Sequence, residues 1–255
     1  MIPHPWRAFR TGLAFALFGL LCILETALVI PVVSRLGGTP DQRERRCQYS
    51  VHLCFRLFVW AMRPLRTIEV RVYGAELLRQ PGQLVIANHP TLLDVVFLIS
   101  GMPQADCVVK QEAWSNRFMR AIVTATGYLP NDEGAGLVDA CVERLAAGRS
   151  LVLFPEGTRS PKGELGPFRR GAIHVALQAG LPMRTVVISC DPPSLMRGQK
   201  WYEVPDRNLV VTLDCRETLD PASVLEGGES RGAAARKVSA TLRDFYAKKL
   251  QTRPS

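Results

Sequence analysis

The sequence predicts an α/β protein with a mainly parallel sheet flanked by helices, preceded by an N-terminal membrane-associated helical segment. Short runs rich in Val, Ile and Leu alternate with longer amphipathic stretches from about Arg63 onward. One apolar run fills residues 12–33. At 255 residues, the chain can form one sizeable core with a small appendage. We therefore expect membrane-anchoring helices at residues 1–62 and an α/β domain at residues 63–255.

The N-terminal run reads GLAFALFGLLCILETALVIPVV and is interrupted only by Glu25. About 20 such residues suffice to cross a bilayer as a helix. A carboxylate near mid-bilayer would cost about 2–3 kcal/mol. Basic residues are more numerous after the run than before it, which favours a cytoplasmic location for the rest of the chain. They are Arg7 and Arg10 before the run, and Arg35, Arg43, Arg45 and Arg46 after it.

A second apolar stretch, Val51–Met62, carries Arg56 and is too short to span a bilayer. We interpret it as an interfacial helix in one leaflet. Two buried core helices are the alternative interpretation of the two stretches. The net charge of +9 favours anionic partners: phospholipid headgroups, nucleic acid or acidic carrier proteins. We expect a membrane-bound protein at the cytoplasmic face of the inner membrane.

The cysteines indicate neither a disulfide framework nor a zinc site. There are 7 of them, an odd number, and none forms a CxxC pair. Buried thiols in a reducing compartment are the simplest interpretation.

The α/β domain is expected to alternate strands with helices, which favours a parallel sheet covered on both faces. The expected strands are Ile68–Tyr73, Gln83–Ala87, Asp106–Val109, Ser150–Phe154, Arg184–Ser189 and Asn208–Asp214. The expected helices are Thr91–Ser100, Glu112–Thr124, Gly136–Ala147, Arg169–Ala179 and Arg231–Leu250. Asp191–Asp206 is expected to be a long surface loop. In such folds ligands bind at the carboxyl ends of strands.

The first informative strand end is LVIANHPTLLDVVF, Leu84–Phe97. His89 precedes Pro90, which pushes it out of the following helix. On one continuous helix, side chains five residues apart would point about 140° apart. From outside the helix, the His89 ring can instead fold back onto Asp94. A neutral imidazole could then take a proton from a hydroxyl while the carboxylate fixes its tautomer. The spacing alone is weak, since chance gives one such pair about one time in six.

The second informative strand end is SLVLFPEGTRSPKGELGPFRRGA, residues 150–172. Gly157 allows a tight turn, and Arg159 can hold an anion with a bidentate grip. Lys162, Arg169 and Arg170 add positive charge. The stretch is a candidate anion site, and a solvated basic turn is the alternative.

Together the two stretches resemble the glycerolipid acyltransferase family, the lysophosphatidic acid acyltransferases and their relatives. Asn88–Asp94 resembles the NHxxxxD block, and Phe154–Ser160 matches the FPEGTRS block residue for residue. The resemblance covers about residues 65–215. Further likenesses are Lys110 after the third family element, Phe168-Arg169-Arg170-Gly171, and Leu181-Pro182 leading into Val186-Val187-Ile188.

This resemblance implies an acyltransferase in which His89 is the general base on the acceptor hydroxyl and Asp94 orients it. The acyl donor would be a thioester on acyl carrier protein or coenzyme A, and the acceptor a membrane lysolipid. No metal, no other cofactor and no covalent acyl-enzyme are implied. The implied substrate-binding residues are Asn88, Lys110, Glu156, Gly157, Thr158 and Arg159.

One position departs from the family pattern. The family usually places Asp-Arg after a glycine and an apolar stretch, and that arginine helps to bind the phosphate. Here the segment Gly127–Glu133 puts Glu133 at the position of the arginine. An anion there should weaken binding of a lysophosphatidic acid monoester. Another lysolipid, an aminoacyl lipid or a nonlipid hydroxyl are the alternative acceptors.

Two other classes of function are alternatives. A catalytically silent membrane protein could bind anionic lipid or acyl carrier protein, but it would not need the His89–Asp94 pair. Nucleic-acid binding is disfavoured, because the sequence has no recognition-helix pattern, zinc finger or basic stripe with interleaved aromatic residues.

Overall fold

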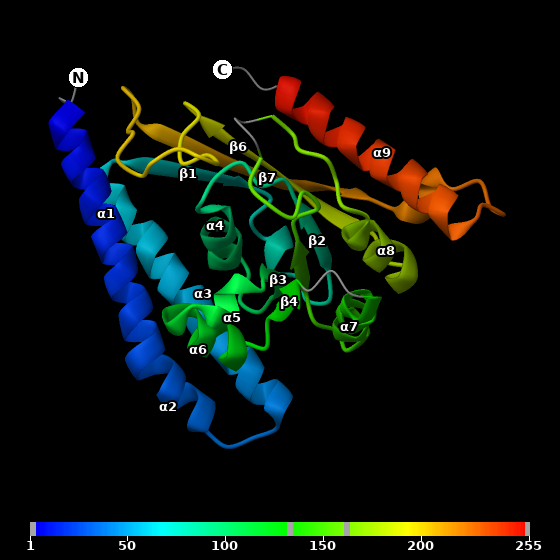
Figure 1. Cartoon of the computed structure of the whole chain (residues 1–255), viewed down its shortest axis with the longest axis horizontal. Helices are drawn as coiled ribbons and strands as arrows, with labels where there is room; N and C mark the ends of the chain where they lie inside the picture. The colour runs from blue at the N-terminus through cyan, green and yellow to red at the C-terminus, as the bar shows by residue number, and fades with distance from the viewer. Residues whose placement is uncertain (1–3, 132–134, 161–163, 253–255) are drawn as a thin grey trace.

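A computed structural model describes residues 4–131, 135–160 and 164–252, which contain a 7-stranded sheet of order β1-β7-β6-β2-β5-β3-β4 (Figure 1). Every neighbouring pair in it is parallel except β6 and β7, which are antiparallel. The mainly parallel α/β fold is therefore confirmed. The strands are β1 Ile68–Tyr73, β2 Leu84–Ala87, β3 Asp106–Lys110, β4 Leu129–Asn131, β5 Leu151–Leu153, β6 Met183–Asp191 and β7 Leu209–Leu219.

Each face of the sheet is buried under its own set of helices. Along β2, Val85 and Ala87 face one core while Leu84 and Ile86 face the other, because successive side chains of a strand point to opposite faces. Helices α3 and α4 cover the first face, and α7, α8 and α9 cover the second (Figure 1). These helices are α3 Pro40–Leu65, α4 Asp94–Gly101, α7 Ala135–Ala146, α8 Arg170–Ala179 and α9 Arg231–Gln251.

The N-terminal quarter of the chain forms a helical hairpin. Its first arm consists of α1 (His4–Leu24), a π-helical turn η1 (Glu25–Val29) and α2 (Ile30–Arg35), and α3 is its second arm. In the part of the chain that the structure describes, Pro5–Arg35 is the one helix long and apolar enough to cross a membrane, and 17% of its most apolar window is buried. One face of α3 packs in the protein core, whereas Leu53, Leu57 and Trp60 on this helix are exposed.

The hairpin buries Glu25, the one charged residue of the apolar run. The π-helical turn begins at Glu25, whose side chain faces α3 and is 6% exposed. Its carboxylate accepts a hydrogen bond of 2.6 Å from the Ser50 hydroxyl. The Ser50 hydroxyl therefore offsets part of the cost of removing this carboxylate from water.

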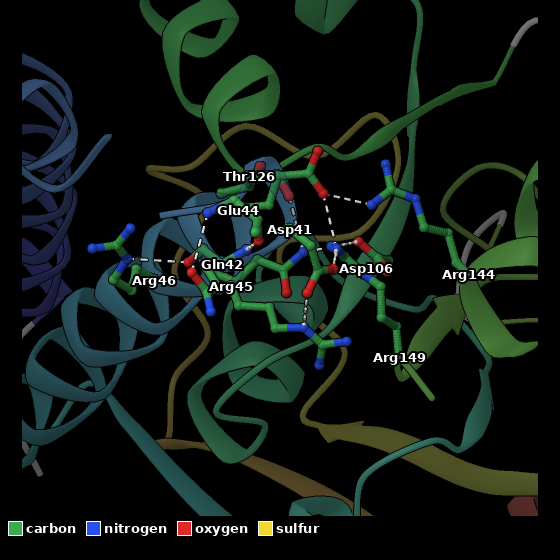
Figure 2. Close-up of polar contacts among 11 residues, drawn as sticks. Asp41, Gln42, Glu44, Arg45, Arg46, Asp106, Thr126, Arg144 and Arg149 are labelled. Atoms are coloured by element: carbon green, nitrogen blue, oxygen red, sulfur yellow. Dashed lines mark hydrogen bonds and ion pairs between the residues drawn. The ribbon is translucent and has the colours of Figure 1, made fainter. Parts of the chain in front are cut away.

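A partly buried ionic cluster joins the start of α3 to the sheet (Figure 2). Arg149, which follows α7, donates to both carboxylate oxygens of Asp106 at 2.6 and 2.7 Å. It also donates to Asp41 at 2.6 Å and Glu44 at 2.9 Å, both on α3. Gln48 donates to Asp106 at 2.8 Å. We call these five residues the Arg149 cluster. Since α3 also packs in the core beside the sheet, the division at residues 62 and 63 stays a prediction.

Several expected boundaries are wrong in detail. The helix expected from Thr91 begins at Asp94, because Thr91 binds the Asp94 side chain and closes a turn before it. The expected helix 112–124 is divided into α5 (Glu112–Ser115) and α6 (Arg117–Ala125). Strand β4 was not expected, since it has only 3 residues and includes a proline. The expected surface loop between β6 and β7 is partly buried at Leu195 and Met196.

Candidate active site

The two sequence motifs meet at one edge of the sheet. Strands β2 and β5 are parallel neighbours, with Ile86 opposite Leu153, so both end at the same edge. His89 follows the end of β2, and the segment Phe154–Ser160 follows the end of β5. This arrangement agrees with the expectation that ligand-binding residues gather at the carboxyl ends of the parallel strands.

The side chains of His89 and Asp94 contact each other directly. His89 Nδ1 lies 2.7 Å from Asp94 Oδ2, so the ring folds back as expected. The carboxylate is completely buried, whereas 16% of the histidine side chain is exposed. A carboxylate can only accept here, so it fixes Nδ1 as the protonated nitrogen and leaves Nε2 as a proton acceptor.

Thr91 holds the Asp94 carboxylate in place, a role that the sequence analysis missed. The Thr91 backbone N–H donates to Asp94 Oδ2 at 2.7 Å, and the Thr91 hydroxyl donates to Oδ1 at 2.5 Å. Burial raises the pKa of the Asp94 carboxyl above its usual range, and the hydrogen bonds from His89 and Thr91 oppose that shift. The signal was a threonine three residues before an aspartate at a helix start, a common pattern of local side-chain hydrogen bonding.

The backbone of His89 is fastened to the second motif. Ser160 N–H donates to His89 O at 2.7 Å, and His89 N–H donates to Glu156 Oε1 at 3.0 Å. The Phe154 ring packs on the imidazole with centroids 4.4 Å apart. The imidazole is therefore positioned by both motifs, and Phe154 and Ser160 take part in this although no role was expected for either.

Two of the expected substrate-binding residues use their side chains to hold the site together. The Asn88 amide is buried and exchanges two hydrogen bonds of 2.7 and 2.8 Å with the backbone of Ile188 on β6. The Glu156 carboxylate is also buried and accepts from His89 N–H, Ser160 Oγ and Gly166 N–H. These contacts make both residues positioning groups, and their direct contact with substrate stays a prediction.

The Gly-Thr-Arg turn lies beside the His89–Asp94 pair. Gly157 has φ +65°, a left-handed conformation that glycine adopts readily. The Arg159 guanidinium donates to the carbonyls of Leu195 and Met196 at 3.3 and 3.2 Å. Thr158 is half-buried in the same turn. Since a guanidinium has five N–H donors, these two contacts leave Arg159 with capacity to bind an anion.

Other expected residues lie at the same edge or outside the described residues. Lys110 is exposed at the end of β3 and pairs in register with Asn131 at the end of β4. Glu133 and Lys162 lie outside the described residues. Residues 4–131, 135–160 and 164–252 contain no group of three or more His, Cys, Asp or Glu side chains suited to a metal ion.

Comparison with known proteins places this geometry in context. Residues 69–189 match the family model described as Acyltransferase. The chain is 29% identical over 157 residues to a 1-acyl-sn-glycerol-3-phosphate acyltransferase of Cocos nucifera, covering 59% of this chain and 49% of that protein. It is 34% identical over 114 residues to the enzyme of the same name from Helicobacter pylori, covering 42% and 48% respectively. The chain thus spans about half the length of these curated relatives.

The fold is shared with a solved structure along nearly the whole chain. The 1-acyl-sn-glycerophosphate (LPA) acyltransferase PlsC from Thermotoga maritima superposes with a TM-score of 0.69 at 20% sequence identity, covering 98% of this chain and 99% of that one. The shared fold is a mainly parallel α/β fold. Residues 69–189 match the Acyltransferase family model, so the resemblance predicted from the two motifs is confirmed over that part of the chain.

Proposed function

We propose that this chain transfers a fatty acyl group from a thioester of coenzyme A or acyl carrier protein to a hydroxyl of a lysophospholipid-type acceptor. One observation carries the proposal: His89 Nδ1 lies 2.7 Å from the buried Asp94 carboxylate, beside the turn that contains Arg159. The names of the curated relatives make 1-acylglycerol-3-phosphate the reference acceptor.

The proposed reaction needs a base but no covalent intermediate on the protein. His89 Nε2 takes the proton of the acceptor hydroxyl as its oxygen attacks the thioester carbonyl carbon. The new C–O bond forms, the C–S bond breaks, and the leaving thiolate takes the proton back from the imidazolium. Asp94 stabilises that imidazolium and keeps the ring in the required orientation.

The helical hairpin supports attachment to a membrane. The helix Pro5–Arg35 is apolar and mostly unburied, and α3 exposes Leu53, Leu57 and Trp60. Exposed apolar side chains on both arms suit insertion into lipid. The basic residues after the apolar run favour the cytoplasmic face for the catalytic domain. Attachment there would bring the site to its lipid acceptor.

The alternative of a silent lipid-binding protein is tested by following the thiol that the donor releases. Purified protein in vesicles is given the acyl thioester of coenzyme A or of acyl carrier protein, with and without 1-acylglycerol-3-phosphate or another lysolipid. Thiol release that depends on the acceptor supports the proposal. A silent binder would release no thiol with any acceptor, and release without acceptor would indicate hydrolysis instead.

Arg159→Ala is expected to raise the apparent KM for the acceptor more than it lowers kcat, because a lost anion contact removes binding that the ground and transition states share. Arg159→Lys should restore only part of the loss, since lysine lacks the planar fork. Steady-state kinetics with both substrates varied provide the measurement. A raised donor KM with an unchanged acceptor KM would reassign the turn to the donor.

Glu133→Arg is expected to improve the use of 1-acylglycerol-3-phosphate by about tenfold or more, because Glu133 stands at the sequence position where the family pattern has a phosphate-binding arginine and an anion there would repel the phosphate. The unmodified chain should use this monoester poorly beside lysolipids without a phosphate monoester. The ratio of kcat/KM values for the two acceptors, in parent and variant, provides the measurement. Efficient use by the parent, unaltered in Glu133→Arg, would mean that Glu133 does not determine the acceptor.

A further inference from the structure

The connection between β6 and β7, residues 192–208, has a buried first part and an exposed aromatic tip. Leu195 and Met196 are buried at 8% and 6% exposure. Trp201 and Tyr202 are each 48% exposed and follow one another in the sequence. Large aromatic side chains exposed side by side often mark a surface that contacts a partner.

The tip packs against α1. The Trp201 ring lies 5.8 Å from the ring of Phe15, centroid to centroid. It also lies against Gly12, where an added Cβ would be 3.4 Å from the indole. Farther along the connection, the carbonyl of Pro205 accepts a hydrogen bond of 3.0 Å from Arg7. The tip therefore lies beside the proposed membrane helix, as Figure 1 shows for the yellow connection and the blue helix.

The same stretch of α1 exposes two more aromatic rings. Trp6 and Phe9 are 53% and 59% exposed, and their rings stack with centroids 5.3 Å apart. Phe9 precedes Gly12 by three residues, so it lies on the adjacent turn on the same side of the helix as the tip. The aromatic surface of the tip thus continues that of α1.

The charge around the tip suits an anionic lipid surface. Arg197 and Lys200 are exposed beside the aromatic pair, and Lys200 Nζ lies 5.5 Å from the centre of the Tyr202 ring. Trp and Tyr favour the level of the lipid headgroups, where one end of the ring is apolar and the other is hydrated. Nearby basic side chains add attraction to anionic headgroups.

We propose that this tip, consisting of Arg197, Lys200, Trp201 and Tyr202, lies in the headgroup region of an anionic bilayer as a second membrane contact beside α1. The inference rests on the membrane attachment proposed for the helical hairpin. It adds a contact made by the catalytic domain itself.

The connection that carries this contact touches both catalytic motifs in space, through Leu195 and Met196. The carbonyl of Leu195 accepts from Leu92 N–H at 3.0 Å and from Arg159 at 3.3 Å, and Met196 O also accepts from Arg159. Leu195 has φ +56°, a left-handed conformation that leucine rarely adopts. The connection therefore joins the proposed lipid contact to the residue that we expect to bind the acceptor.

The test uses the full chain with Trp201 as its single tryptophan, made by Trp6→Phe, Trp60→Phe and Trp114→Phe. The protein is bound to vesicles of phosphatidylcholine and phosphatidylglycerol that contain lipids brominated either near the headgroup or near the chain end. Quenching of the Trp201 fluorescence should be about twofold stronger with bromine near the headgroup. Replacing phosphatidylglycerol with phosphatidylcholine should weaken this quenching of the Trp201 fluorescence.

The matched control places the single tryptophan on α9 instead, by Phe245→Trp together with Trp201→Phe in the same background. Helix α9 lies on the opposite side of the molecule from α1 (Figure 1), so no bromolipid should quench it. If the single-tryptophan variant does not fold, the parent protein is compared with its Trp201→Phe variant. The difference in headgroup quenching between the two then reports on Trp201.

Flotation of the same samples with vesicles separates the two proposals. Protein that floats while Trp201 is quenched no more than the α9 control would overturn the tip contact and leave the hairpin attachment intact. Protein that does not float would overturn both. Flotation with strong quenching near the headgroup supports the tip contact.

Discussion

His89→Ala is expected to lower the rate of acyl transfer by about 10²–10⁴-fold, the usual contribution of a positioned general base. The His89 ring is only partly buried and its backbone contacts do not need the imidazole, so the variant should fold and float with vesicles. Initial rates with saturating donor and acceptor provide the measurement.

His174→Ala is the matched control for this experiment. His174 lies within α8, is partly buried and belongs to neither catalytic motif, so its removal should leave the rate near that of the parent. Turnover of His89→Ala close to that of His174→Ala would contradict the assignment of His89 as the base.

Arg149→Leu is expected to lower the free energy of unfolding by about 3–5 kcal/mol, because it leaves a buried charge without its partner. Asp106 is completely buried, and Arg149 donates a hydrogen bond to each of its two carboxylate oxygens (Figure 2). The start of α3 would lose its ionic link to the sheet as well. Denaturant unfolding of the detergent-solubilised protein provides the measurement.

Arg71→Leu is the control for a surface ion pair. Arg71 meets Glu69 at 2.7 Å, but both side chains are more than half exposed, at 51% and 57%. Exposed pairs contribute about 0–1 kcal/mol. Equal losses of stability in Arg71→Leu and Arg149→Leu would show that the Arg149 cluster contributes no more than an ordinary surface pair.

Features that depend on neighbouring residues could be predicted from the sequence. Strand β1 has the predicted bounds, Ile68–Tyr73, because it is a short alternating run between turn residues. The proline after His89 was sufficient to place the ring outside the helix, and with it the contact to Asp94. The parallel topology then brought the second motif to the same edge.

Contacts between residues far apart in the chain could not be predicted in this way. Asn88 binds the backbone of Ile188 across 100 residues, and Arg149 meets Asp41 across 108. No local pattern indicates such partners, since they depend on which strands become neighbours. The sequence therefore pointed to substrate binding for Asn88 and Glu156, while the structure shows that their polar groups bind the protein.

The most direct test of the proposed activity is to follow a labelled acyl chain from its thioester to a lipid product. Purified parent protein in vesicles receives a panel of lysolipids and a thioester of coenzyme A or acyl carrier protein with a labelled acyl chain. Mass spectrometry then identifies the acylated lipid. We expect the label on a lysolipid hydroxyl, with product formation dependent on His89. Folded, vesicle-bound protein that acylates no member of the panel, or that does so equally well as His89→Ala, would contradict the proposed activity or its mechanism.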